Sequence, residues 1–98
     1  MKPEFDKENW QEFLKLCKFL NTEEQANEFF ELFFTIEEKR AIAARCAIIK
    51  DLLKGEKTQR EIAADSNTSI AKITRGSNSL KRISNDLREF LQEQLLKT

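Results

Sequence analysis

Basic side chains with helical spacing are the residues of this chain best suited to recognition chemistry. Four of them, Lys72, Arg75, Lys81 and Arg82, lie between Ser66 and Arg82, a stretch that contains no acidic residue. Guanidinium and ammonium groups bind carboxylates and phosphates through charge-assisted hydrogen bonds. The stretch therefore predicts a binding surface for an anion.

Catalytic and metal-binding groups are scarce in this sequence. The chain has no histidine, and its two cysteines, Cys17 and Cys46, have a spacing that fits neither a zinc motif nor a redox pair. Because both cysteines lie among apolar residues, we expect free, buried thiols, with a disulfide as the alternative. No nucleophile stands beside a base, so the composition predicts a binding protein without a metal rather than an enzyme.

The basic stretch overlaps a pattern of two short helices joined by a polar turn. Thr58 begins a capping-box signature ahead of residues 59–65, and Ser69 can cap a second helix over residues 70–75. Asn67, between them, can adopt the left-handed conformation of a tight turn. The arrangement is typical of a helix-turn-helix, although the same pattern also occurs as a plain corner of a helical bundle.

The second of these helices divides its residues between a core face and a face for DNA. Ile70 and Ile73 can seat the helix on the core. The residues left to enter a major groove are polar or small, namely Ala71, Lys72 and Thr74. Two residues at the start of the preceding helix are placed to hold phosphates, Gln59 and Arg60.

Helix-start signals and helical periodicity extend over the rest of the chain. Three segments have the form T-x-x-E/Q, beginning at Thr22, Thr35 and Thr58. Apolar residues recur every three or four positions in the first two predicted helices, at Trp10, Phe13, Leu14, Cys17 and Leu20 and again at Ala26, Phe29, Phe30 and Phe33. With two glycines, one proline and no convincing strand, the sequence predicts an all-α fold of six helices.

Two longer helices are predicted on either side of the basic stretch. One runs from Ile36 to about Lys54 and stops at Gly55, because glycine readily takes the left-handed conformation that ends helices. Its apolar residues cover a wide arc, so we expect it to be the most buried element. The last helix begins near Ser84 or Asn85, with an apolar face of Leu87, Phe90, Leu91 and Leu95.

The phenylalanine content predicts an interface. Four phenylalanines stand close together, at positions 29, 30, 33 and 34. Adjacent residues on a helix point about 100° apart, so one small chain would struggle to bury both directions. Because an exposed apolar patch of that size usually marks an interface, we expect a homodimer, with an ordinary monomeric core as the alternative.

Zero net charge conceals an uneven distribution. Residues 1–40 carry 6 basic and 10 acidic side chains, whereas residues 41–98 carry 11 basic and 7 acidic ones. The asymmetry points to a polyanion as partner of the basic half, and an unevenly charged solvated surface is the alternative. No apolar run approaches the length of about 18 residues that a membrane span needs, so we expect a cytoplasmic protein without a membrane partner.

A specific resemblance lies in the run ITRGSNSLK, from Ile73 to Lys81, which is similar to the tryptophan repressor family. The likeness covers nearly the whole chain and includes the segments TQRE at 58–61 and DLR at 86–88. It implies an intertwined homodimer of six-helix chains with protruding helix-turn-helix heads. Residues 1–98 would form one domain, with a dimerisation core over about 6–54, the helix-turn-helix over about 58–76 and the C-terminal helix over about 84–97.

The family's ligand is L-tryptophan, which acts as a corepressor, and the resemblance implies where this chain would hold it. Arg45 and Arg75 would lie on opposite faces of the indole, and Arg75 would also pair with the carboxylate. Gly76 would leave room for the ring. The remaining contacts would be the hydroxyls of Thr35 and Ser79 and, for the ammonium group, the backbone carbonyls at Leu32 and Phe34 of the other subunit.

Each pocket residue also has a plainer interpretation. Thr35 and Ser79 can serve as helix caps, Arg45 can be a snorkelling or ion-paired arginine within an apolar arc, and Gly76 can end the recognition helix. For DNA, the whole predicted contact set is Lys54, Gln59, Arg60, Ser69, Ile70, Ala71, Lys72, Thr74 and Lys81.

Three features depart from the family's pattern. The turn reads Asn67-Thr68-Ser69 where the family has a glycine, Ala63 stands where a basic residue is typical, and Lys72 replaces a smaller threonine. These departures bear on operator affinity and sequence preference more than on the ligand.

The resemblance thus implies a homodimeric repressor that binds operator DNA when L-tryptophan is present. It would control genes of tryptophan biosynthesis or uptake in a bacterial cytoplasm, and its two heads would read half-sites about one helical turn apart. Two alternatives stay open: a helical dimerisation module that binds no DNA, and a related DNA-binding regulator that responds to another ligand.

Overall fold

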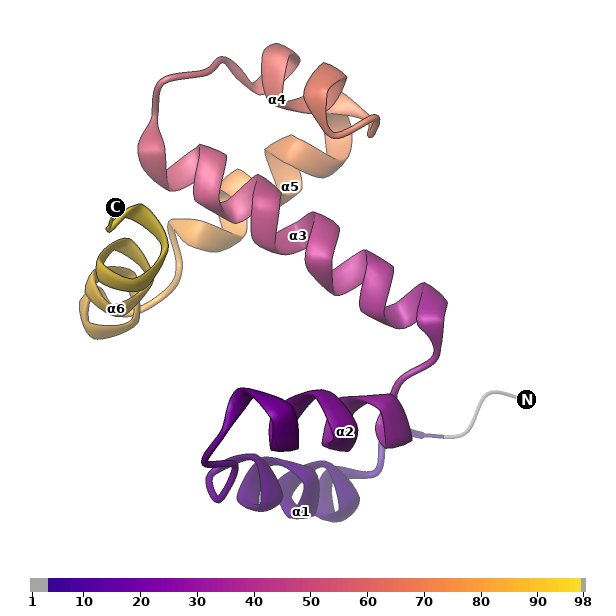
Figure 1. Ribbon diagram of the computed structural model, residues 1–98. Helices are drawn as coiled ribbons and strands as arrows, with labels where there is room; N and C mark the ends of the chain where they lie inside the picture. The colour runs from indigo at the N-terminus through magenta and orange to yellow at the C-terminus, as the bar shows by residue number, and fades with distance from the viewer. Residues whose placement is uncertain (1–3, 98) are drawn as a thin grey trace. The chain divides into compact units, whose positions relative to one another are not determined.

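The computed structural model describes residues 4–97, and the predicted domain of residues 1–98 extends beyond them by residues 1–3 and 98. Six helices and no strand occupy the described residues, which confirms the predicted all-α fold (Figure 1). The chain divides into two compact units, the first ending at Ile36 and the second beginning at Glu37. None of the helices within residues 4–97 is long and apolar enough to cross a membrane.

The first unit contains helices α1 (Lys7–Cys17) and α2 (Glu23–Phe33). The Asp6 carboxylate caps α1 by accepting from the Asn9 amide at 2.9 Å. Thr22 caps α2 by accepting from the Gln25 amide at 3.0 Å, but the Gln25 side chain accepts from Asn21 rather than from Thr22. The predicted capping box at Thr22 is therefore only half formed.

Phe13 of α1 stands at the centre of an aromatic cluster that joins α1 to α2. Its ring centroid lies 5.4 Å from that of Trp10 and 5.1–6.5 Å from those of Phe29, Phe30, Phe33 and Phe34. Part of the phenylalanine excess is thus packed within one chain. Much apolar surface of this unit still faces solvent, with exposed fractions of 81% at Leu32, 74% at Phe19 and 46% at Phe33.

The second unit is built on the long helix α3 (Ile36–Lys54), which ends at Gly55 with φ +70° as predicted. The expectation that this helix is the most buried element is wrong for the chain by itself, because no residue of Ile36–Lys54 is buried. Cys46, a free thiol as predicted, is exposed, and the free thiol of Cys17 is only half-buried. The predicted apolar arc is present on α3, but the rest of this chain covers only part of it.

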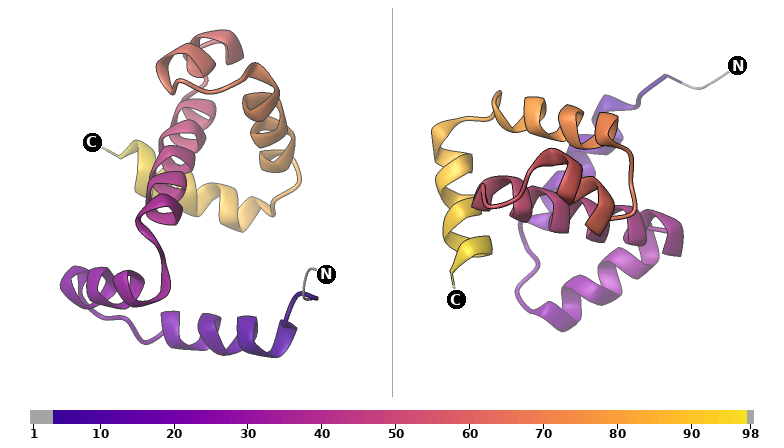
Figure 2. Two further views of the ribbon diagram at one scale, coloured as in Figure 1. Left: turned by 90° about the vertical axis from the view of Figure 1, so that its right-hand side faces the viewer. Right: turned by 90° about the horizontal axis from the view of Figure 1, so that it is seen from above.

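The buried core of this unit lies between helices α4 (Gln59–Asp65) and α5 (Ile70–Leu80), near the end of α3 (Figure 2). Ile62, Ala63 and Ile73 are 1%, 5% and 0% exposed, and Ile48 and Leu52 of α3 pack against them. Ala63, one of the three departures from the family's pattern that the resemblance suggests, is therefore a core residue here. Ile70 does not join the core, because 46% of its surface is exposed.

Helix α5 is longer than predicted, since it continues through Gly76 to Leu80. Gly76 has no positive φ and does not end the helix, so that plainer interpretation is wrong. A helical glycine costs about 1 kcal/mol relative to alanine. Leu80, which is 9% exposed and seven residues beyond the buried Ile73, offsets this cost by packing on the same side. Helix α6 (Asn85–Leu96) follows, capped by Ser84 as predicted.

Candidate ligand pocket and DNA-facing surface

A pocket of about 610 Å³ opens among α3, α5 and α6, entirely within the second unit. Four predicted ligand residues line it together: Arg45 from α3 and Arg75, Gly76 and Ser79 from α5. Ser79 lies inside α5 and is not an N-terminal helix cap. The rest of the wall is largely aliphatic and includes Ala41, Ala44, Ile48, Ile49, Leu80, Ile83, Leu87 and Leu91.

The charged residues of this pocket are all cations. Arg45, Lys72 and Arg75 line it, and none of the described lining residues is acidic. None of these three side chains makes an ion pair with a carboxylate within residues 4–97. Of the two plainer interpretations of Arg45, only the ion-paired one is therefore wrong for residues 4–97. An aliphatic pocket with unpaired cations suits a ligand that has an apolar body and a carboxylate.

Gly76 has space around it in the protein itself. A Cβ added at this position would meet the Leu52 side chain at 3.6 Å, which is an ordinary van der Waals contact. The packing of α5 on α3 consequently tolerates alanine here. Because Gly76 has no side chain, the pocket wall is open at this position.

The other three predicted ligand residues, Leu32, Phe34 and Thr35, belong to the first unit. Leu32 is highly exposed, Phe34 is half-buried beside the aromatic cluster, and Thr35 directly precedes α3. The predicted ligand set is therefore divided, with four residues gathered in the pocket of one unit and three on the other unit.

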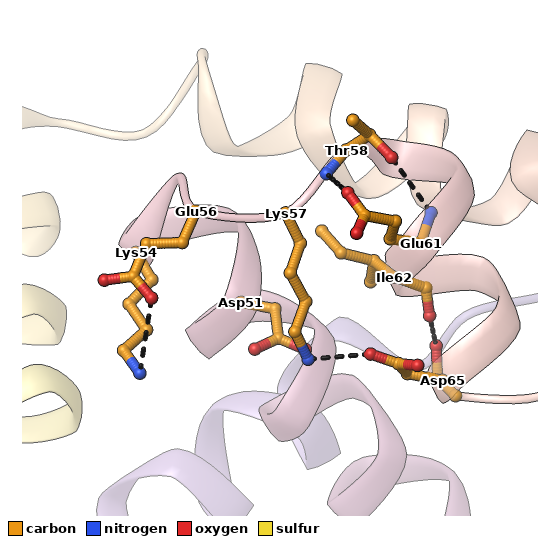
Figure 3. Close-up of polar contacts among 9 residues, drawn as sticks. Asp51, Lys54, Glu56, Lys57, Thr58, Glu61, Ile62 and Asp65 are labelled. Atoms are coloured by element: carbon orange, nitrogen blue, oxygen red, sulfur yellow. Dashed lines mark hydrogen bonds and ion pairs between the residues drawn. The ribbon is translucent and has the colours of Figure 1, made fainter.

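The two short helices and their turn form the predicted helix-turn-helix. Thr58 and Glu61 complete a capping box at the start of α4, with distances of 2.9 Å from the Thr58 amide to the Glu61 carboxylate and 3.1 Å from the Glu61 amide to the Thr58 hydroxyl (Figure 3). Asn67 has φ +50°, as the turn requires in place of glycine. Ser69 caps α5 by accepting from the Lys72 amide at 3.2 Å.

The predicted DNA contacts lie mostly on the surface of this motif. The exposed members of the set are Lys54, Arg60, Ser69, Ile70, Ala71, Lys72, Thr74 and Lys81. Gln59 is half-buried, and its side-chain oxygen accepts a hydrogen bond from the Thr74 hydroxyl at 2.6 Å. Lys54 lies 3.9 Å from Glu56, an exposed ion pair that leaves its ammonium accessible.

Lys57 forms a bridge that the sequence did not predict. Its ammonium nitrogen lies 2.7 Å from an Asp65 carboxylate oxygen and 3.5 Å from one of Asp51, so it links the end of α4 to α3 (Figure 3). The hydrogen bond to Asp65 raises the pKa of Lys57, with the charge of Asp51 adding to it. The separations of six and eight residues match no helical period, so no local pattern indicates this bridge.

Lys72 is also a pocket residue, although the sequence predicts only a DNA contact for it. The spacing of the pocket residues along α5 is a signal that indicates this role. Lys72, Arg75, Gly76 and Ser79 lie at i, i+3, i+4 and i+7, which places them on one face of a helix. The predicted helix over residues 70–75 already contains Lys72 and Arg75, and the continuation of α5 to Leu80 extends this face to Ser79.

Fold and site together define a helix-turn-helix protein with a cation-lined pocket at the back of its second helix. The chain matches the family described as Trp repressor protein over residues 8–95, and it belongs to that family of DNA-binding transcriptional repressors. The family is regulatory rather than enzymatic.

Individual relatives resemble the chain over most of its length. It is 44% identical over 90 residues to a Trp operon repressor homolog of Chlamydia trachomatis serovar D, covering 92% of this chain and 96% of the relative. The corresponding protein of Chlamydia caviae is 45% identical over 92 residues, covering 94% and 91%. That of Haemophilus influenzae strain PittEE is 38% identical over 88 residues, covering 90% and 87%.

Proposed function

We propose that this protein is a repressor activated by L-tryptophan, which binds operator DNA as a homodimer and controls genes of tryptophan biosynthesis or uptake. The observation that carries the proposal is the pocket shared by Arg45 and Arg75, two cations from different helices in a wall that is otherwise largely aliphatic. Because a repressor must reach operator DNA, which lies in the cytoplasm of a bacterium, we assign this protein to the bacterial cytoplasm.

The ligand would enter this pocket with its indole between the two guanidinium groups. Guanidinium groups stack on aromatic faces, and Arg75 would also pair with the carboxylate. Ser79 and Thr35 would contribute hydroxyls to the polar end. The ammonium group would donate to the backbone carbonyls at Leu32 and Phe34 of the second subunit, because carbonyl oxygens are the acceptors that an ammonium requires.

The homodimer is supported by apolar surface that one chain leaves open. The exposed fractions of Leu32, Phe33 and Ile42 are 81%, 46% and 46%. Exposed aliphatic and aromatic side chains in this number are typical of a chain that buries them against a second copy.

DNA binding would use the exposed face of α5 and the start of α4. Ala71 and Thr74 would meet base edges or phosphates in the major groove, while Arg60 and the N-terminus of α4 would hold phosphates. The ligand would act by binding more tightly to the chain when the two heads are oriented for successive grooves, since only such a difference in affinity can shift the equilibrium.

Calorimetry with L-tryptophan tests the pocket, and fluorescence anisotropy with labelled operator DNA at fixed salt tests the switch. We expect one ligand per chain and tighter DNA binding when L-tryptophan is present. Absence of any heat of binding would remove the ligand assignment. Ligand binding without a change in DNA affinity would leave the pocket but contradict the switch.

A further inference from the structure

Lys72 occupies a position that the DNA-binding role does not explain. It lines the ligand pocket together with Arg75, Gly76 and Ser79 on one face of α5. Its backbone is held in the first turn of the helix by the hydrogen bond from its amide to the Ser69 hydroxyl at 3.2 Å. Its ammonium group has no carboxylate partner within the described part of the chain.

The electrostatic surroundings of this lysine favour an anion in the pocket. Arg45 and Arg75 line the same pocket, which has no acidic residue in its described wall, and the first turn of α5 contains no acidic residue either. Backbone N–H groups at a helix N-terminus add positive potential to that side. Three cations without a carboxylate partner in the described chain therefore line a largely aliphatic space that can hold the apolar body of a ligand.

We propose that Lys72 is a specificity-determining residue of this pocket, selecting ligands that present a carboxylate beside an apolar ring over their neutral counterparts. The proposal rests on the proposed function, because it takes the indole ligand class from there. It assigns Lys72 to the ligand rather than to DNA alone, and it concerns the third cation of the pocket rather than the arginine pair.

The test compares indole-3-propanoate with indole-3-propanamide, two probes that differ in charge but have the same ring. Their affinities for the full chain would be measured by calorimetry in the wild type, Lys72→Met, Lys72→Arg and Lys50→Met. Lys50 is an exposed α3 lysine outside the pocket, so it is a matched control. Circular dichroism would check that each variant keeps its helices.

The ratio of acid to amide affinity should fall about fivefold in Lys72→Met, the size expected from losing one partly solvated ion pair. Lys72→Arg should restore the ratio, and Lys50→Met should leave it unchanged. An unchanged ratio in Lys72→Met, or equal losses for acid and amide, would overturn the proposal while leaving the pocket intact. If the wild type binds neither L-tryptophan nor either probe, the proposed function itself fails and this proposal fails with it.

Discussion

The Thr74 hydroxyl donates a hydrogen bond to the side-chain oxygen of Gln59 at 2.6 Å, and this contact joins the first residue of α4 to the middle of α5. Both residues belong to the predicted DNA-contacting set. Because the hydroxyl is oriented by Gln59, the two side chains should act on DNA as a unit.

Gln59→Ala and Thr74→Val should therefore weaken operator binding in a non-additive way. Their coupling energy should be about 1 kcal/mol, the typical net worth of one hydrogen bond. Fluorescence anisotropy on the two single variants and the double variant gives this value. Asn78→Ala combined with Gln59→Ala is the control pair, and additive losses for Gln59 and Thr74 would contradict the coupling.

Gly76→Ala should separate ligand binding from stability. The added Cβ meets only an ordinary contact at Leu52, and alanine is favoured over glycine in a helix by about 1 kcal/mol, so the melting temperature should stay level or rise. Affinity for L-tryptophan should fall by a factor of about 10 or more, because overpacking of a fitted site costs about 1–3 kcal/mol. Calorimetry and thermal unfolding check both parts. Unchanged affinity would show that the ring does not approach Gly76.

Arg75→Ala should weaken L-tryptophan binding much more than Lys72→Ala. Arg75 would supply both a carboxylate partner and a stacking surface, and a charge-assisted hydrogen bond is worth about 1.5–3 kcal/mol, so a loss of more than about tenfold is expected. Calorimetry on both variants measures the difference, with the exposed Arg82→Ala as control. Equal losses for Arg75 and Lys72 would contradict the role given to Arg75.

Acid should weaken the start of α4. The hydrogen bond that the Thr58 amide donates to the Glu61 carboxylate is the main cause that holds the pKa of this carboxyl below its ordinary value of 4.5. Because the folded-state pKa is lowered, the ionised carboxylate stabilises the folded chain fully at pH values above the ordinary pKa of 4.5. This stabilisation is lost as the pH falls through the folded-state pKa. The difference in melting temperature between the wild type and Glu61→Gln should therefore narrow as the pH is lowered from about 7 to about 3. A difference that stays constant would contradict this linkage.

Local signals predicted the ends of helices better than their burial. Gly55 and Asn67 take the left-handed conformations expected of them, and Ser69 and Ser84 cap the helices that they precede. These features depend on a few adjacent residues, so the sequence contains their full cause. The predicted burial of α3 is wrong for the single chain. Apolar periodicity shows which face of a helix is apolar, but it does not show whether the same chain or a second copy covers that face.

The sequence by itself determined the six helices, the helix-turn-helix and the family, because caps, turn residues and the run from Ile73 to Lys81 are local in the chain. Only the tertiary structure decided which of the chemically active residues share a site. Packing of α5 on α3 brings Arg45 to the same pocket as Arg75, thirty residues away, and the continuation of α5 through Gly76 adds Ser79 to the wall that Lys72 and Arg75 line. The same packing buries Ala63. Such relationships depend on contacts between distant segments, which no local pattern of residues specifies.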